Sequence, residues 1–254
     1  MAVTFPFSLL MQLFEIPGFT VNPMMIVHGE QYFELKRPLP TAAAFTNHAH
    51  ISHVYDKGSA AVILMETSTR DDAGEEIALN RSSFFVRGIG GFGGDRGPSG
   101  KINLPPEREP DASSQQQTQP NQALLYRLNS SGDRNPLHAD PQMAAFGGFN
   151  RPILHGLCTY GFAARAVLKQ FAANDVSRFK AMQARFSKHV FPGETLLTDA
   201  HTISDQIRGY VDVIGDLEQA PPGIEEAIDP LLQRREDAEH QGRESADQRG
   251  QHAP

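Results

Sequence analysis

The stretch PILHGLCTYGFAARAVLKQFA, residues 152–172, decides the fold of this chain. Apolar residues fall on every side of a helix drawn through it, and its only charged residues are Arg165 and Lys169. A helix that is apolar all round is typically buried all round. Gly156 and Gly161 leave room for other backbones to approach it. A curved antiparallel sheet is an economical wrapper for such a helix, so an α+β fold is expected.

Short segments on both sides of this helix predict the strands of that sheet. Some alternate polar and apolar residues, which indicates a half-buried strand, and others are continuously apolar. The predicted strands are 31–35, 60–65, 82–86, 182–190, 194–201 and 206–214. A weak internal repeat accompanies them: QYFELKRPLP at 31–40 resembles QARFSKHVFPG at 183–193. Each copy follows an apolar helix-like segment, which predicts two helix-and-sheet units.

The glycine-rich stretch GIGGFGG, residues 88–94, contains a match to G-x-G-x-x-G. A dinucleotide site needs a helix directly after such a loop, to receive the pyrophosphate. Here the chain continues as Asp95-Arg96-Gly97-Pro98 instead. We therefore interpret the stretch as a flexible exit from a strand.

Composition divides the chain into four segments. Residues 1–94 form a first half, and residues 95–120, with five prolines and a Ser-Ser-Gln-Gln-Gln run, indicate a flexible linker. Residues 121–216 form a second half, and the polar tail 217–254 is expected to be disordered.

Charge and cysteine content exclude several classes of protein. The 254 residues carry 23 Lys and Arg against 30 Asp and Glu, a net charge of −7, which argues against a nucleic-acid partner. No apolar run reaches ~18 residues, so membrane insertion is not expected. The single cysteine, Cys158, excludes an internal disulfide and lies in the apolar helix, where it is expected to be a small core residue.

The residues that carry chemistry lie in LNSSGDRNPLHAD, residues 128–140. Asn135-Pro136 is a good cap and first-turn pair, so a helix can start there. Asp133 would then lie in the approach loop and His138 in the first turn, and both side chains could face one water. A carboxylate and an imidazole in that position can divide acid and base roles.

A second element is His155-Gly156 at the start of the apolar helix. Free backbone N–H groups at a helix N-terminus suit a developing oxyanion. Plainer interpretations stay open, because an isolated Asp-x-Asn-Pro is most often a cap and an isolated histidine is most often structural. A zinc site from His138, Asp140 and His155 is conceivable without clear ligand spacing. Leu137 stands where calcium would need an oxygen ligand.

Four segments together resemble one known family. They are VHGEQYFELKRPLP (27–40), GDRNPLHADP (132–141), RPILHGLCTYGFAARAVLKQFA (151–172) and VSRFKAMQARFSKHVFPGETL (176–196). The chain is similar to the hydratase 2 family, the MaoC-like (R)-specific enoyl-CoA hydratases, which include the hydratase part of peroxisomal multifunctional enzyme type 2. The resemblance covers roughly residues 1–200.

The resemblance implies a double hot-dog fold, incomplete at both ends, whose first half binds acyl-CoA and whose second half is catalytic. It implies that water adds to a trans-2-enoyl-CoA in fatty-acid β-oxidation, giving the (3R)-3-hydroxyacyl-CoA without metal or other cofactor. Asp133 and His138 would activate the water, Gly156 would supply the oxyanion N–H, and Asn135 would position the reactants. The expected acyl-CoA contacts are His28, Gly29, Lys57, Arg134, Pro136, Leu137 and Phe186.

Three departures from the family pattern accompany the resemblance. We expect an upstream strand and part of a helix to be missing, two residues to be inserted between Leu128 and Asp133, and the closing strands to be shortened. A non-catalytic acyl-CoA-binding protein, or a related hot-dog thioesterase or dehydratase, is the alternative. The sequence does not decide whether the chain forms a homodimer. The family implies a peroxisomal location in a eukaryote and otherwise a cytoplasmic one, although residues 251–254 carry no peroxisomal tripeptide.

Overall fold

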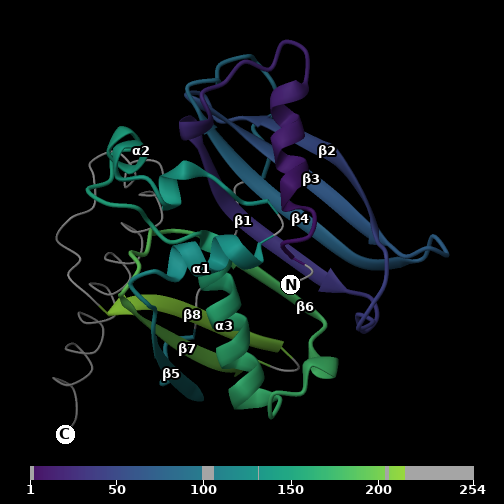
Figure 1. Cartoon of the computed structure of the whole chain (residues 1–254), viewed down its shortest axis with the longest axis vertical. Helices are drawn as coiled ribbons and strands as arrows, with labels where there is room; N and C mark the ends of the chain where they lie inside the picture. The colour runs from purple at the N-terminus through teal and green to yellow at the C-terminus, as the bar shows by residue number, and fades with distance from the viewer. Residues whose placement is uncertain (1–2, 99–105, 131, 204–205, 215–254) are drawn as a thin grey trace, which may run out of the picture. The chain divides into compact units, whose positions relative to one another are not determined.

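The computed structural model describes residues 3–98, 106–130, 132–203 and 206–214. The predicted tail, 217–254, lies outside the described residues. The described part contains two antiparallel sheets with a long helix packed against them (Figure 1). No helix in these residues is long and apolar enough to cross a membrane.

The larger sheet has five strands in the order β2-β3-β4-β1-β6, and every neighbouring pair is antiparallel. Its strands are β1 (Ile26–Leu35), β2 (Thr46–Asp56), β3 (Ala60–Arg70), β4 (Glu76–Arg87) and β6 (Ala181–Arg185). Two 3-10 helices, η1 (Phe7–Glu15) and η2 (Pro23–Met25), precede β1.

The smaller sheet has three strands in the order β5-β7-β8. They are β5 (Ala112–Gln117), β7 (Thr195–Ile203) and β8 (Gln206–Ile214). Between β5 and β6 the chain forms α1 (Gln122–Asn129), η3 (Pro136–His138), α2 (Pro141–Phe146), α3 (Gly156–Phe171) and η4 (Val176–Arg178). The α-helices thus form one run between two runs of antiparallel strands, which confirms the α+β class.

Strand β5 corrects the expectation that residues 95–120 are wholly a linker. Ala112–Gln117 pairs antiparallel with β7, and the Thr118 N–H donates to the Glu194 carbonyl at 2.9 Å. The side chains of β5 alternate between half-buried and exposed. An edge strand is held mainly by backbone hydrogen bonds and buries little apolar side-chain area. A Ser/Gln-rich strand of this kind therefore has no hydrophobic pattern that would predict it from sequence.

The two copies of the internal repeat lie side by side. β1 and β6 pair antiparallel, so that Tyr32 is opposite Gln183 and Phe33 is opposite Met182. The strand expected at 182–190 ends at Arg185. This pairing joins the first half of the chain to the second within one sheet.

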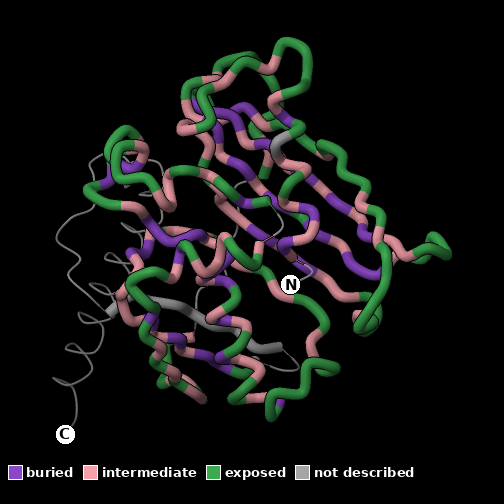
Figure 2. The backbone as a smooth tube through the Cα atoms, in the orientation of Figure 1, coloured by how far each residue is buried: buried purple, intermediate pink, exposed green. Residues whose placement is uncertain are grey.

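The apolar helix α3 is buried on one side only. Its buried residues are Leu157, Cys158, Tyr160, Ala163 and Ala166. Gly161, Arg165 and Lys169, four residues apart, form an exposed stripe. The prediction of burial on every side is therefore wrong, because the described sheets cover the opposite side of the helix and leave this stripe to solvent (Figure 2).

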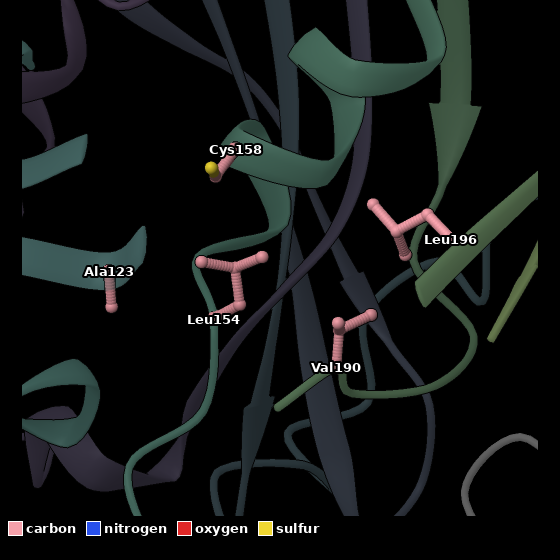
Figure 3. Close-up of a cluster of buried hydrophobic side chains, with 5 residues drawn as sticks. All are labelled: Ala123, Leu154, Cys158, Val190 and Leu196. Atoms are coloured by element: carbon pink, nitrogen blue, oxygen red, sulfur yellow. The ribbon is translucent and has the colours of Figure 1, made fainter. Parts of the chain in front are cut away.

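Helix α3 contributes to two cores. Leu157 and Tyr160 pack with Phe33 of β1 and Ala78 of β4, and so anchor the helix to the larger sheet. A second cluster joins α1, the start of α3 and β7; its members are Ala123, Leu154, Cys158, Val190 and Leu196 (Figure 3). The N-terminal end of α3 is thus fixed from both sides. Cys158 is a core residue, as expected, and its burial raises the pKa of its thiol.

The glycine-rich stretch after β4 folds around a carboxylate. Asp56 Oδ1 accepts hydrogen bonds from the Gly58 and Gly91 N–H groups, and Oδ2 accepts one from Gly93, each at 2.8 Å. These donors hold the pKa of Asp56 below its ordinary value. The stretch is therefore a defined loop built on Asp56, which corrects the expectation of a flexible exit.

Candidate active site

Asp133 lies between α1 and η3, where it is buried although its neighbours Gly132 and Arg134 are exposed. It is 6% exposed, and the Asn135 N–H donates to its carboxylate. Burial raises the pKa of Asp133 from 3.8 to about 6, although the backbone donor and Arg127 oppose the shift. The preceding Gly132 has φ +95 and lies near Ser8 of η1, where an added Cβ would come within 3.1 Å of the serine Cβ. The segment before β1 therefore lies beside the turn that carries Asp133.

His138 lies in η3, which begins as predicted at Asn135-Pro136. The Asn135 side chain caps η3 by accepting from the Leu137 N–H at 3.0 Å. The His138 Nδ1 lies 2.9 Å from the Ile153 carbonyl oxygen. A carbonyl can only accept, so Nδ1 carries the proton and Nε2 has a free lone pair. Burial lowers the pKa of His138 from 6.5 to about 4, so the ring is neutral near pH 7.

The His155 side chain stands between these two groups. Its Nε2 lies 3.9 Å from Asp133 Oδ1, and its ring stacks on the His138 ring with centroids 3.8 Å apart. His155 is only 1% exposed, and burial lowers its pKa far below 6.5, so it is neutral and forms no ion pair. Asp133 and His138 thus meet on either side of His155, whose side chain the sequence suggested only as a zinc ligand.

Two residues of α1 complete this end of the site. The Tyr126 ring lies 4.5 Å from the His155 ring, on which it packs, and burial raises the pKa of its hydroxyl. The Arg127 guanidinium donates to the Arg134 carbonyl at 3.2 Å, and its charge lowers the pKa of Asp133. Neither Tyr126 nor Arg127 was predicted as a site residue, because the sequence of α1 does not indicate which part of the fold its side chains face.

Gly156, the first residue of α3, connects this cluster to a second one. Its backbone N–H has no acceptor within the helix. A Cβ added at Gly156 would lie 3.2 Å from the Phe186 ring. Phe186 in turn lies edge-on to His28, with centroids 5.1 Å apart, and its N–H donates to the Gly29 carbonyl at 2.9 Å. The structure therefore brings together the predicted residues His28, Gly29, Phe186 and Gly156.

His28 and Gly29 owe their positions to a bulge in β1. The register of β1 against β4 shifts between His28 and Glu30, at Gly29. Phe84 of β4 lies 5.0 Å from the His28 ring. This apolar setting lowers the pKa of His28 to about 4 and keeps the imidazole neutral.

The remaining predicted contact residues do not all lie in this cluster. Lys57 follows β2, where its Nζ donates to the Arg96 carbonyl and lies 5.6 Å from the Tyr55 ring centroid. Three strand steps, about 14 Å at ~4.8 Å each, separate β2 from β1. Arg134 and Pro136 are exposed, and Leu137 is half-buried and packs on the α2 end at Gly147.

The zinc alternative fits this geometry poorly. Asp140 caps α2 by accepting from the Gln142 N–H at 2.8 Å, and His138 and His155 stack face to face. Among the described residues, no group of three or more His, Cys, Asp or Glu side chains is arranged to hold a metal ion.

A cavity of about 230 Å³ lies elsewhere, lined by Tyr32, Glu66, Arg81 and Gln183 among others. Tyr32 and Arg81 are opposite each other in the β1–β4 pair, next to the buried pair Phe33 and Asn80. Neighbouring residues of a strand point to opposite faces. This cavity therefore opens on the face of the larger sheet away from the core and does not belong to the site above.

Two family descriptions match the chain. Residues 1–88 match the MFE-2 hydratase 2 N-terminal domain, and residues 101–217 match the MaoC like domain. The crystal structure of a MaoC-like dehydratase from Phytophthora capsici matches with a TM-score of 0.70 and 40% identity, over 76% of this chain and 68% of that one. With the sheet and helix arrangement above, this confirms the expected double hot-dog fold.

Curated relatives agree. The probable enoyl-CoA hydratase 2 of Dictyostelium discoideum is 47% identical over 80% of this chain and 70% of its own length. The peroxisomal multifunctional enzyme type 2 of Mus musculus is 52% identical over 74% of this chain, but only 25% of its own length is covered. On these matches, together with its hot-dog architecture, the chain belongs to the MaoC-like enoyl-CoA hydratase 2 family.

Proposed function

We propose that this chain hydrates trans-2-enoyl-CoA to (3R)-3-hydroxyacyl-CoA, a step of fatty-acid β-oxidation. The observation that carries the proposal is the cluster of Asp133, His138 and Gly156 at the N-terminal end of α3. It offers a buried carboxylate, a neutral imidazole with a free Nε2 and a helix N-terminus within one region. The names of the relatives support the same reaction class.

In the proposed reaction one water supplies all the atoms added. His138 Nε2 accepts a proton from the water as the water oxygen bonds to C3 of the enoyl group. The electrons of the double bond move toward the thioester oxygen, where the Gly156 N–H receives the negative charge. Protonated His138 then returns the proton to C2. Asp133 accepts a hydrogen bond from the second O–H of the water, which stays on the oxygen as the 3-hydroxyl group, and its negative charge stabilises the transient imidazolium.

We assign acyl-CoA binding to the first half of the chain, residues 1–94, and catalysis to residues 121–216. His28 and Phe186 form an apolar wall beside Gly156, which suits the acyl chain or the thioester. Lys57 is suited to a CoA phosphate as a point charge, about 14 Å away by strand spacing. Such a separation requires an elongated ligand. In this proposal the entrance to the acyl-CoA site is bordered by Arg134, Pro136 and Leu137.

Location and assembly are parts of the same proposal. The mouse relative is named as peroxisomal, which supports a peroxisomal location for this chain. Co-localisation of a tagged full-length chain with a peroxisomal marker tests this. A homodimer is the assembly we propose, and light scattering on the purified chain tests it.

The reaction is tested by following the loss of enoyl-thioester absorbance with crotonyl-CoA and with trans-2-decenoyl-CoA, while a thiol reagent monitors free CoA. The proposal expects absorbance loss without release of CoA. Release of free CoA would assign a thioesterase instead. No absorbance loss with folded protein would contradict hydration.

A second candidate function, acyl-CoA binding without catalysis, is favoured by one specific distance. The Asp133 carboxylate faces His155 at 3.9 Å rather than His138. Calorimetry with a saturated acyl-CoA distinguishes the candidates when combined with the assay above. Binding by a chain without turnover would favour this function, whereas turnover would exclude it.

A further inference from the structure

His155 is a buried polar residue with unused hydrogen-bonding capacity. Neither of its ring nitrogens has a hydrogen-bond partner among the described residues, although it is only 1% exposed. Leaving such groups unpaired is unfavourable, so an unpaired buried imidazole beside a reactive cluster needs an explanation. Apolar packing alone does not provide one, because a phenyl ring would fill the same space without that penalty.

The neighbours of His155 define what its ring can do. It lies between the Tyr126 ring at 4.5 Å and the His138 ring at 3.8 Å, which restricts its rotation. Its Nε2 faces Asp133 Oδ1 at 3.9 Å, which is too long for a hydrogen bond. A closure of about 1 Å would make one, and hydrogen bonds in catalytic sites are often long before the substrate binds.

We propose that His155 is a positioning residue: its ring fixes the plane of the His138 ring by stacking, and its Nε2–H holds the Asp133 carboxylate toward the reacting water. This inference rests on the proposed hydration. It requires the tautomer with the proton on Nε2, which the facing carboxylate favours. His155 itself does not contact the reacting atoms.

Other titratable groups surround this contact and define the controls. Arg127 and Tyr126 face it from α1, His138 faces it from η3, and Cys158 lies one turn further along α3. Arg127 is the cationic group whose charge acts on Asp133, His138 and His155. The variants below leave all of these groups in place, except for the packing control.

Two variants separate the hydrogen bond from the packing. His155→Phe keeps a stacking ring but removes the donor, whereas His155→Gln keeps an N–H at a similar distance from the backbone but removes the ring. Cys158→Ala, on the same helix and facing the second core cluster, is the packing control. For each variant we measure kcat, KM, the melting temperature and the pKa of Asp133 by carbon NMR, the last with a bound saturated acyl-CoA, which occupies the site and cannot be hydrated.

We expect His155→Phe to lower kcat about 10–100-fold, the range of a lost hydrogen bond to a charged group, with KM within about twofold. The pKa of Asp133 should rise, because its ionised form loses a donor. His155→Gln should restore the Asp133 pKa toward the wild-type value and recover part of kcat. Cys158→Ala should lower the melting temperature but leave both kcat and the pKa of Asp133 unchanged.

Two results would overturn the inference. One is His155→Phe with wild-type kcat and an unmoved Asp133 pKa. The other is Phe and Gln variants that lose kcat equally with the Asp133 pKa unmoved, which would assign His155 to packing. A wild-type chain without hydratase activity would refute the proposed function instead, while the NMR titration would still decide whether His155 holds Asp133.

Discussion

Asp133 is a carboxyl group in a place that disfavours its charge. Its pKa is raised to about 6, so the folded state binds the proton more tightly than the unfolded state between pH 3.8 and 6. Above pH 6 the ionised carboxylate therefore destabilises the fold. Asp133→Asn removes that charge and should increase the free energy of unfolding at pH 7 by on the order of 1–3 kcal/mol.

The same substitution should lower the hydration rate at least ~100-fold, the usual effect of losing an acid–base group. Urea denaturation and the absorbance assay measure the two effects on one preparation. A variant that is both less stable and fully active would contradict the role given to Asp133.

The pH dependence of the rate follows from the same group. Proposed catalysis needs ionised Asp133 and neutral His138, whose pKa values are about 6 and about 4. As the pH falls through about 6, Asp133 gains a proton and kcat/KM should decrease, while His138 stays neutral. Initial rates between pH 8 and 5 test this. A flat profile over that range would argue against a catalytic carboxylate here.

Among single residues, Asp133, His138 and Gly156 were singled out from the sequence, and the structure gathers them at the start of α3, while their catalytic roles stay a prediction. The sequence was not sufficient for the His155 side chain or for Tyr126, because their importance lies in stacking across three segments. The available signal was a histidine directly before the glycine that opens an apolar helix. From the sequence, that histidine was interpreted through its backbone at the helix start and as a conceivable zinc ligand, and not as a partner of Asp133.

At the scale of elements, two glycines should respond oppositely to the same change. A Cβ at Gly90 would lie 2.4 Å from the Ala60 nitrogen and from the Gly58 carbonyl oxygen, both backbone atoms. Gly90→Ala should therefore destabilise the chain by about 1–3 kcal/mol. Gly161 lies in the exposed stripe of α3 with open space around it, so Gly161→Ala should stabilise by about 0.5–1 kcal/mol.

Melting temperatures of the two variants against wild type check this pair. A stabilising Gly90→Ala would show that the loop around Asp56 is not held as described. A destabilising Gly161→Ala would show that the exposed stripe is covered.

Elements with an apolar or alternating pattern were predictable, as β1, β3 and α3 show. β2 was not delimited because most of its side chains are exposed, so it has little burial pattern. β5 was taken for linker because its stability comes from pairing with β7, whose partner residues lie 78 (Gln117 to Thr195) to 88 (Ala112 to Ala200) positions further along the chain. The loop at 88–94 was misjudged because its organising group, Asp56, lies on another strand.

At the scale of the whole molecule, buried neutral histidines make stability depend on pH. His28, His138 and His155 all have pKa values lowered by burial, the first two to about 4. The unfolded chain therefore binds more protons between pH 6.5 and 4, so stability should fall as the pH is lowered through that window. Asp133 acts in the opposite direction and offsets only part of the loss.

The expected loss is on the order of a few kcal/mol, since one pKa unit corresponds to ~1.4 kcal/mol. Calorimetry from pH 7 to 4 should show a steadily decreasing melting temperature. An unchanged melting temperature down to pH 4.5 would mean that these imidazoles are hydrated rather than buried.

The presence of two similar helix-and-sheet units was predictable from the sequence, because the internal repeat indicates two copies of one unit. The pairing of β1 with β6 was not predicted, because a sequence repeat contains no information on how its two copies pack against each other.

The most direct measurement of the central claim is the product that the purified full chain forms from trans-2-decenoyl-CoA, resolved by chiral chromatography. Addition of water by Asp133 and His138 beside the Gly156 amide predicts the (3R)-3-hydroxy thioester, with formation abolished in Asp133→Asn. A (3S) product, or no product from folded wild-type protein, would contradict the account.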